Sequence, residues 1–267
     1  MISPNVRELV FEREDGATVD FEAGQWITLL LHPPDEGTYN GDDCNGVEIR
    51  RSYSIASPPF SSRAHRPFLS NAAQFEIAVT RVEGGAGSEL LHSLPLGARI
   101  RALGPQGFFT RPLATAAPSL FVATGTGVTP CRSMIHAACD ARRGEPITLL
   151  FGARHEADII YRDEFEQLAR EHANVRVEFT LSQPDGRWSG RQGYVQTHVE
   201  EMWNAINSPK KEGEIPTASS PALSPALSPA LAHVYVCGLQ KMVSAVREVL
   251  RTGLAIPRAQ VHSERYD

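Results

Sequence analysis

Three side chains in one short segment have the chemistry to hold an anionic, aromatic ligand: Arg51, Tyr53 and Ser54. The Arg51 guanidinium offers parallel N–H donors that fit a phosphate group. The Tyr53 ring offers a flat stacking surface, and the Ser54 hydroxyl can donate a hydrogen bond. Because neighbouring residues on a strand point to opposite faces, Tyr53 and Ser54 do not simply fill one core. The alternative is an edge strand that carries an unrelated Arg and Tyr.

Two glycine-rich turns further along the chain could bind phosphate through backbone amides. The first, residues 84–88 (GGAGS), precedes a short helical pattern, and a loop beside a helix N-terminus forms an anion site. Ser88 could instead act only as the N-cap of that helix. The second turn, residues 124–130 (TGTGVTP), follows an apolar strand and opens a helix with Pro130 in its first turn. No Gly-Lys-Ser/Thr follows it, which excludes a Walker A loop.

Two further candidates lie near the end of the chain. Cys237 closes an apolar segment that we interpret as a parallel strand, and such sheets bind ligands at their carboxyl edge. The alternative for Cys237 is a buried structural cysteine. Glu264 and Tyr266 stand two residues apart just before the last residue. A charged terminus is otherwise a frayed surface tail.

The first half of the chain is predicted to form a small antiparallel barrel. Its apolar or alternating runs are short and are separated by Gly-, Pro- and Asp-rich turns, such as residues 33–35 and 84–87. Regularly spaced short strands without long helices favour a barrel, and the chain is expected to begin within its first strand. The predicted strands are Glu8–Phe11, Trp26–Leu31, Arg51–Ala56, Gln74–Val82 and Arg99–Leu103.

The second half alternates strands and helices, and its near-continuous apolar strands imply a doubly wound parallel sheet. The helix after Cys237 has an apolar i, i+4, i+7, i+8 stripe that starts at Met242. The predicted strands are Leu120–Ala123, Ile147–Phe151, Val175–Leu181, Val234–Cys237 and Gln260–His262. The other predicted helices are Thr129–Asp140, Asp163–Glu171 and Tyr194–Ile206.

These patterns predict two domains: an antiparallel β-barrel over residues 1–113 and an α/β domain with a doubly wound parallel sheet over residues 114–267. Residues 207–232 form a low-complexity insert that ends in three Ser-Pro-Ala-Leu repeats. Its prolines exclude helix and central strand, so we predict an extended surface loop. The insert is either a tolerated insertion or a ligand for a proline-recognising partner.

Composition narrows the class of protein. With 267 residues, of which 42% are hydrophobic and 21% charged, the chain reads as a soluble globular protein. Its net charge of -5 argues against nucleic-acid binding. No run of about 18 apolar residues predicts a membrane span, and no basic-then-apolar leader begins the chain, so a cytoplasmic enzyme is expected. Cys44, Cys131, Cys139 and Cys237 form no C-x-x-C pair, so the zinc and iron–sulfur spacings are missing.

Taken in order, these motifs resemble those of the ferredoxin–NADP reductase family of FAD enzymes. The resemblance covers the chain except for the insert and the loop around Thr38–Asn45, and Asp267 is one residue more than the family pattern has. The matches are R-x-Y-S-x-x-S at 51–57, the barrel-closing G-P-x-G turn at 104–107, G-T-G-x-x-P at 125–130, C-G-L at 237–239 and a terminal E-x-Y at 264–266.

The resemblance implies FAD as cofactor and NADP(H) as coenzyme, with NAD(H) as the alternative. Hydride would pass between nicotinamide C4 and flavin N5, and single electrons would pass to a ferredoxin, a flavodoxin or an oxygenase component. Catalytic roles fall on Ser54, on Cys237 beside the nicotinamide, and on Glu264 as a proton relay. The implied FAD contacts are Arg51, Tyr53, Ser54, Ala78, Val79, Gly85, Gly87, Ser88 and Tyr266, whose ring would cover the flavin. The implied NAD(P) contacts are Thr126, Gly127, Thr129, Ser182, Arg191, Tyr194, Gln196, Cys237 and Gly238.

The choice of coenzyme depends on the adenosine end of the site. Gln183 stands where the NADP-specific pattern of the family has arginine, so Arg187 or Arg191 is expected to contact the 2′-phosphate, and we favour NADPH over NADH. Two other functions stay open: an NADH-dependent reductase component of a multicomponent oxygenase, and a flavin-binding regulatory module without turnover. The presence of Arg51, Ser54 and Cys237 together disfavours the regulatory module.

Overall fold

The computed structural model describes residues 1–32, 48–59, 69, 71–208 and 232–266. Several features discussed above lie outside these ranges: Cys44, the turn at 33–35, the loop around Thr38–Asn45, the Ser-Pro-Ala-Leu repeats and Asp267. Within the described residues, no helix combines the length and the apolar character that crossing a membrane requires.

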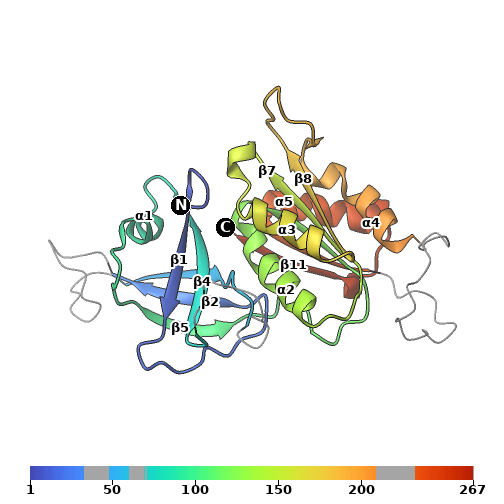
Figure 1. Ribbon diagram of the computed structural model, residues 1–267. Coiled ribbons are helices and arrows are strands. Elements are labelled where there is room, and N and C mark those ends of the chain that lie inside the picture. Colours follow the sequence, from blue (N-terminus) through green and yellow to red (C-terminus); the bar gives the residue numbers. More distant parts are fainter. Residues whose placement is uncertain (33–47, 60–68, 70, 209–231, 267) are drawn as a thin grey trace.

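Within its described residues, the N-terminal half has five antiparallel strands near the five that the sequence predicts, and they lie in two sheets (Figure 1). One sheet pairs β1 with β4, and the other has the order β3-β2-β5. The two sheets meet just after β3, because the amide of Ile55 donates to Gln25 O and the amide of Ala56 donates to Glu76 O. The strands are β1 (Val6–Glu12), β2 (Trp26–Leu31), β3 (Ile49–Ser54), β4 (Gln74–Thr80) and β5 (Arg101–Gln106).

One apolar core joins the two sheets. Alternate residues of β2, such as Ile27, Leu29 and Leu31, point into it together with Ile77 and Val79 of β4. The short helix α1 (Ala86–Ser93) packs on the same core through Leu91. The core therefore positions α1 against the strand that carries Arg51, Tyr53 and Ser54.

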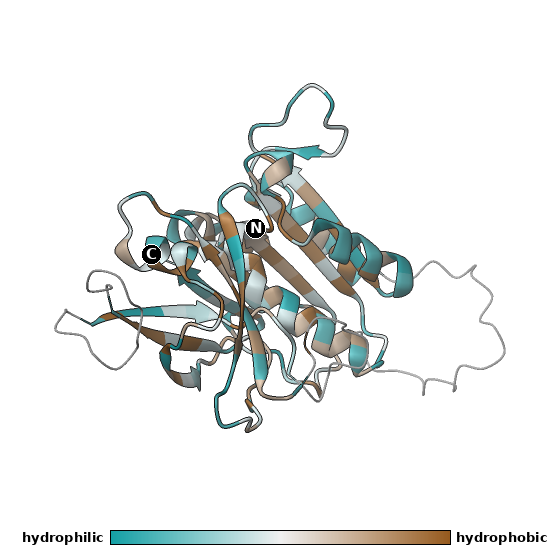
Figure 2. Cartoon of the chain, turned by 60° about the vertical axis from the view of Figure 1, so that its left-hand side comes forward, coloured by the Kyte–Doolittle hydropathy of each residue, from teal (hydrophilic) through white to brown (hydrophobic). Residues whose placement is uncertain are grey.

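The C-terminal half is a six-stranded parallel sheet in the order β11-β10-β6-β7-β8-β9. Figure 2 shows its central strands as largely hydrophobic, whereas the helices outside them carry many hydrophilic residues. The strands are β6 (Ser119–Thr124), β7 (Ile147–Ala153), β8 (Val175–Leu181), β9 (Arg191–Gln192), β10 (His233–Leu239) and β11 (Val261–Tyr266). The helices are α2 (Val128–Asp140), α3 (Arg162–Glu171), α4 (Val199–Asn207) and α5 (Gln240–Glu248).

Helices cover both faces of this sheet, so the doubly wound arrangement is confirmed. Phe121 of β6 belongs to the apolar core under α2 and α3, whereas its neighbours Leu120 and Val122 belong to the core under α4 and α5. Parallel strands buried on both faces are the reason why these segments read as continuous apolar runs.

The structure differs from the sequence-based prediction at several element ends. β3 spans Ile49–Ser54 rather than Arg51–Ala56, because the chain leaves the β2 ladder after Ser54 to meet β4. The helix predicted from Tyr194 begins as a 3₁₀ turn at Val195–Thr197 before α4, and α5 continues into a π-helical turn at Val249–Gly253. Strand β9 was not predicted, since two residues carry no readable alternation.

Candidate active site

Three of the candidate residues meet where the barrel touches the parallel sheet. Ser54 is the last residue of β3 and is 4% exposed. Its hydroxyl donates to Glu264 Oε1 at 3.0 Å, and its oxygen lies 2.7 Å from Tyr266 Oη. Glu264 and Tyr266 share one face of β11, because residues two apart on a strand point the same way. Figure 1 shows the C-terminus at this junction, so Glu264 and Tyr266 do not belong to a frayed tail.

Burial sets the protonation of these groups. It raises the pKa of Glu264 above the ordinary carboxyl value, although the hydrogen bond from Ser54 opposes that shift. It raises the pKa of the Tyr266 hydroxyl far above its usual range, so this hydroxyl stays protonated and can donate to Ser54 Oγ. The site therefore holds a carboxyl group that accepts a proton more readily than an exposed glutamate does.

Cys237 and Thr129 flank this trio on the side of the sheet. Cys237 on β10 lies directly opposite Glu264 in the β10–β11 ladder and is fully buried. Burial raises the pKa of the Cys237 thiol well above its usual range, so the sulfur stays protonated and is a packing group rather than a thiolate nucleophile. Thr129 Oγ1 lies 3.5 Å from Tyr266 Oη and donates to Thr126 O at 2.8 Å.

Two turns of the parallel sheet approach each other so closely that only glycine fits. A Cβ on Gly127 would lie 2.4 Å from Cys237 O, and a Cβ on Gly238 would lie 2.4 Å from Thr124 Oγ1. Gly238 also has a φ of +152°, a value that other residues rarely adopt. Both turns stand at the carboxyl edge of the sheet, the usual binding edge of such folds.

Thr124 carries a signal that sequence reasoning missed. Its Oγ1 is buried, and in the described part of the chain it has no hydrogen-bond partner. A buried polar atom without a partner is costly in a finished core, so it fits a site that a ligand completes. The sequence clue was a polar residue at the end of an otherwise apolar strand, directly before Gly125.

Arg51 and the N-terminus of α1 lie together on the barrel. The N-terminus of α1 begins after Gly85, and a Cβ on Gly87 would lie 2.9 Å from Arg51 Cγ, so the guanidinium chain passes directly over the helix start. Arg51 is exposed, and its Nη1 donates to Arg50 O. A cation beside free helical amides fits the diphosphate of a dinucleotide. Arg7 donates to Leu91 O and Leu94 O and so fixes the opposite end of α1.

Ser88 lies inside α1 rather than at its N-cap, so the N-cap interpretation of Ser88 was wrong. Its hydroxyl donates to Gly85 O at 2.9 Å and accepts from the Val82 amide at 3.0 Å, which ties the helix to the preceding loop. Ser88 therefore shapes the glycine-rich loop.

The other candidates on the barrel are mostly buried. Tyr53 packs partly on the barrel core, and burial raises the pKa of its phenol to about 12, so the ring stays neutral. Ala78 and Val79 of β4 are at most 5% exposed. Val79 O lies 2.8 Å from His92 Nε2, so that carbonyl is already engaged.

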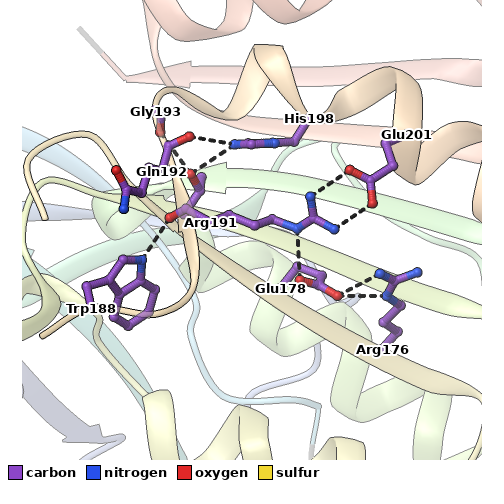
Figure 3. A network of polar contacts seen from close by, with 9 residues as sticks. Arg176, Glu178, Trp188, Arg191, Gln192, Gly193, His198 and Glu201 are labelled. Atoms are coloured by element: carbon purple, nitrogen blue, oxygen red, sulfur yellow. Dashed lines mark hydrogen bonds and ion pairs between the residues drawn. The ribbon is translucent and has the colours of Figure 1, made fainter.

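The candidates for the adenosine end lie along the far edge of the parallel sheet. Ser182 follows β8, Tyr194 is 66% exposed, and Gln196 lies in the 3₁₀ turn before α4. Arg191 on β9 donates from Nε to Glu178 and from both Nη atoms to Glu201, as Figure 3 shows. Two carboxylates thus engage every nitrogen of its guanidinium group. The exposed Arg187 has a single ion pair, with Asp185 at 3.7 Å.

Comparison with known proteins identifies the family. A family model described as "Oxidoreductase FAD-binding domain" matches residues 1–110, and one described as "Oxidoreductase NAD-binding domain" matches residues 121–248. The chain is 50% identical to Ferredoxin--NADP reductase B of Sorangium cellulosum (strain So ce56), over all of this chain and 93% of that protein. The chain belongs to the ferredoxin–NADP reductase family. It is therefore an FAD-dependent oxidoreductase, as its motifs predict.

Two further similarities have lower identity. The chain is 31% identical to DmpP, the reductase component of phenol 2-monooxygenase from Pseudomonas sp. (strain CF600), over 99% of this chain but only 62% of DmpP. Its fold matches a ferredoxin NADP+ reductase from Neisseria gonorrhoeae, solved with bound FAD and NADP, with a TM-score of 0.69 and 18% identity over 99% of this chain and 94% of that one. The last similarity shows the fold alone.

Arg51→Ala is expected to lose most bound FAD, since it removes the guanidinium group that lies over the α1 N-terminus while leaving the barrel core untouched. A charge-assisted contact of this kind contributes about 1.5–3 kcal/mol, which corresponds to roughly 10- to 150-fold weaker FAD binding. Flavin content after gel filtration and the dissociation constant for FAD measure the effect. Arg50→Ala is the matched control, because Arg50 is exposed and pairs with Glu48 instead. Equal flavin retention in both variants would contradict the phosphate role.

Proposed function

We propose that this enzyme moves hydride between NADPH and its bound FAD and exchanges single electrons with a separate carrier, a ferredoxin or a flavodoxin. The observation that carries the proposal is the meeting of Ser54 from the barrel with Glu264, Tyr266, Thr129 and Cys237 from the α/β domain. The two family models and the 50% identical relative support the cofactors, and the name of that relative supports ferredoxin as partner.

The redox chemistry belongs to FAD and the nicotinamide when they are bound, and the chain supplies binding, orientation and a proton site. Arg51 and the α1 amides would hold the FAD diphosphate, and Tyr53 would face its ring. The nicotinamide end of the coenzyme would bind beside Gly127 and Gly238, where the absence of side chains lets a ligand approach the backbone. The Thr124 hydroxyl, which has no partner among the described residues, would hydrogen-bond to it there. Cys237 would close the site against water.

Glu264 Oε1 is the proton site that we propose. Its raised pKa and its hydrogen bond from Ser54 Oγ allow a proton to rest on the carboxyl or move along the Ser54 hydroxyl toward the site. A group of this kind contributes about 10²- to 10⁴-fold to rate when proton transfer limits it. Tyr266 Oη keeps Ser54 Oγ oriented toward Glu264 by donating to it.

For the 2′-phosphate of NADPH we propose Arg187 and the exposed Arg154, with Ser182 between the two loops. The backbone amides of Ser182 and Gln183 donate to Ala153 O and Arg154 O, so the loops after β7 and β8 lie side by side. Arg191 is the weaker candidate, because Glu178 and Glu201 already neutralise it (Figure 3). These exposed cations favour NADPH over NADH.

Two further features belong to the proposal. We place the domain boundary at residues 113/114, in the segment between the end of β5 at Gln106 and the start of β6 at Ser119. We also infer a cytoplasmic location, because Cys131, Cys139 and Cys237 are unpaired thiols and free thiols persist in reducing compartments.

Anaerobic titration of the FAD-loaded chain with NADPH tests the function. NADPH is expected to bleach the visible flavin bands stoichiometrically, and NADH is expected to do so at least tenfold more slowly. Faster bleaching by NADH would favour the second candidate, a reductase component of a multicomponent oxygenase, which the similarity to DmpP suggests. A yellow protein that neither coenzyme bleaches would refute the proposal and favour a regulatory module.

A further inference from the structure

A buried cluster of charges lies where α2 and α3 meet the barrel. At its centre is Arg132 of α2, which is 2% exposed. Its Nη1 donates to Glu76 Oε2 of β4 at 2.8 Å, while its Nε and Nη2 donate to the two carboxylate oxygens of Glu164 on α3 at 2.8 and 3.0 Å. His136 also contacts Glu164. We call this set the Arg132 cluster; its members are Glu8, Glu76, Arg132, His136, Tyr161 and Glu164.

Stability alone does not explain such a cluster. Burying an ion pair costs desolvation energy that apolar residues of the same size would avoid. Tyr161 moreover has a φ of +59° in the left-handed region, which places its ring 4.0 Å from Arg132 Cζ. Backbone strain of this kind persists where the surroundings demand one geometry. The features together point to a requirement for orientation.

The position of the cluster shows what is oriented. Arg132 Nη1 also donates to Ala56 O at 3.0 Å, and Ser133 Oγ donates to Ser57 O at 2.8 Å. Two consecutive residues of α2 thus bind two consecutive carbonyl groups of the segment that follows Ser54. Because residues three and four apart share one face of a helix, Arg132 and Ser133 lie on the same side of α2 as Thr129, which approaches Tyr266.

We propose that Arg132 and Ser133 are positioning residues for hydride transfer. Helix α2 opens at the glycine turn that would hold the nicotinamide coenzyme, and the Ala56–Ser57 carbonyls follow the strand that would hold the flavin. Three hydrogen bonds, to Glu76, Ala56 and Ser57 of the barrel, fix the first against the second, and two more from Arg132 to Glu164 hold it against α3. Neither residue touches a cofactor; each acts through the placement of α2. This inference rests on the proposed function for the identity of the transferred group, hydride; the contacts that position α2 do not depend on it.

The test compares Arg132→Lys and Ser133→Ala in the full-length, FAD-loaded chain. Lysine keeps the charge, but its single ammonium cannot reproduce the planar fork that joins Glu164, Glu76 and Ala56 O. Arg170→Lys and Ser208→Ala are the matched controls, because both side chains are exposed, on α3 and just after α4. Three quantities are measured: flavin content, amide hydrogen exchange of residues 54–59 and of α2, and the single-turnover rate of flavin reduction by NADPH with its deuterium isotope effect.

Both cluster variants are expected to retain FAD and to exchange the α2 amides faster, by about tenfold for Arg132→Lys. Hydride transfer should slow by roughly 10- to 100-fold in Arg132→Lys and by a few-fold in Ser133→Ala, because a displacement near 1 Å has that effect on reaction rate. The isotope effect should become more temperature-dependent, since a looser α2 broadens the donor–acceptor distance. A change in stability alone would leave that dependence unchanged.

Wild-type hydride transfer rates and isotope effects in both folded variants would overturn the positioning role, even with faster exchange. Should Arg132→Lys fail to fold, Ser133→Ala decides, because it removes one hydrogen bond and no charge. Failure of NADPH to reduce the wild-type flavin would instead refute the proposed function. In that case slow exchange of α2 in wild type and fast exchange in the variants would still show that the contacts fix α2.

Discussion

Replacing Arg132 by leucine is expected to lower the free energy of unfolding by about 3–5 kcal/mol, because it removes the cation that pairs with the buried Glu76 carboxylate and with the partly buried Glu164. A surface pair gives the comparison. Arg13→Leu removes an exposed partner of Asp15, and such pairs contribute roughly 0–1 kcal/mol. Urea unfolding of the FAD-loaded variants, followed by circular dichroism, measures both effects. Equal midpoints for the two variants would contradict the buried-charge account.

The effect of Arg132→Leu should also depend on pH. Burial raises the pKa of Glu164, but the contacts with His136 and Arg132 lower it by more than burial raises it. The pKa of Glu164 therefore lies below the ordinary 4.5 in the folded state. A carboxyl with a depressed pKa contributes stability that is present above its unfolded value and is lost as pH falls through its folded value. The difference in free energy of unfolding between wild type and Arg132→Leu should therefore be largest near pH 7 and become smaller below pH 4.5.

The double variant Glu76→Gln with Arg132→Leu tests the cause of the loss. It removes the buried negative charge of Glu76 together with the cation that offsets it, so it should be more stable than Arg132→Leu alone, although it carries two substitutions. If the loss of stability in the double variant equals the sum of the losses in Glu76→Gln and Arg132→Leu, then Glu76 and Arg132 do not interact.

The sequence predicts the elements of this fold better than it predicts which of them touch. The apolar runs of β6, β7, β8 and β10 are buried on both faces, so each is visible without knowledge of its partners. Ser54 and Glu264 are 210 positions apart, and no local pattern could pair them. The resemblance to a family predicted that both belong to one site, and the structure brings them within a hydrogen bond.

Arg132 and Thr124 escaped prediction for a physical reason. A lone arginine in an amphipathic helix normally marks the solvent face, and its burial becomes visible only when Glu76 and Glu164 are placed around it. Arg191 shows the converse. Its sequence position suggested a phosphate ligand, but Glu178 and Glu201 come from other elements and engage it first. Whether an arginine is free to bind a ligand therefore depends on residues that only the tertiary structure places around it.

Gly127→Ala is expected to slow reduction by NADPH on the order of 10²-fold while leaving FAD in place. The added Cβ would stand 2.4 Å from Cys237 O and 2.7 Å from Gly238 Cα, and both are backbone atoms that cannot rotate away. Overpacking at such a point costs about 1–3 kcal/mol and moves the backbone. The turn before α2 and the end of β10 must then separate, and a displacement of about 1 Å slows hydride transfer on the order of 10²-fold.

Gly186→Ala is the matched control, because a Cβ there meets no heavy atom within 4 Å and its φ is not in the left-handed region. Flavin content and the single-turnover rate with saturating NADPH are measured in both variants. Since Arg51 and α1 lie in the barrel, Gly127→Ala should keep wild-type flavin content, which separates a loss of coenzyme geometry from general unfolding. Reduction of Gly127→Ala at the rate of Gly186→Ala would place the coenzyme away from this edge of the sheet.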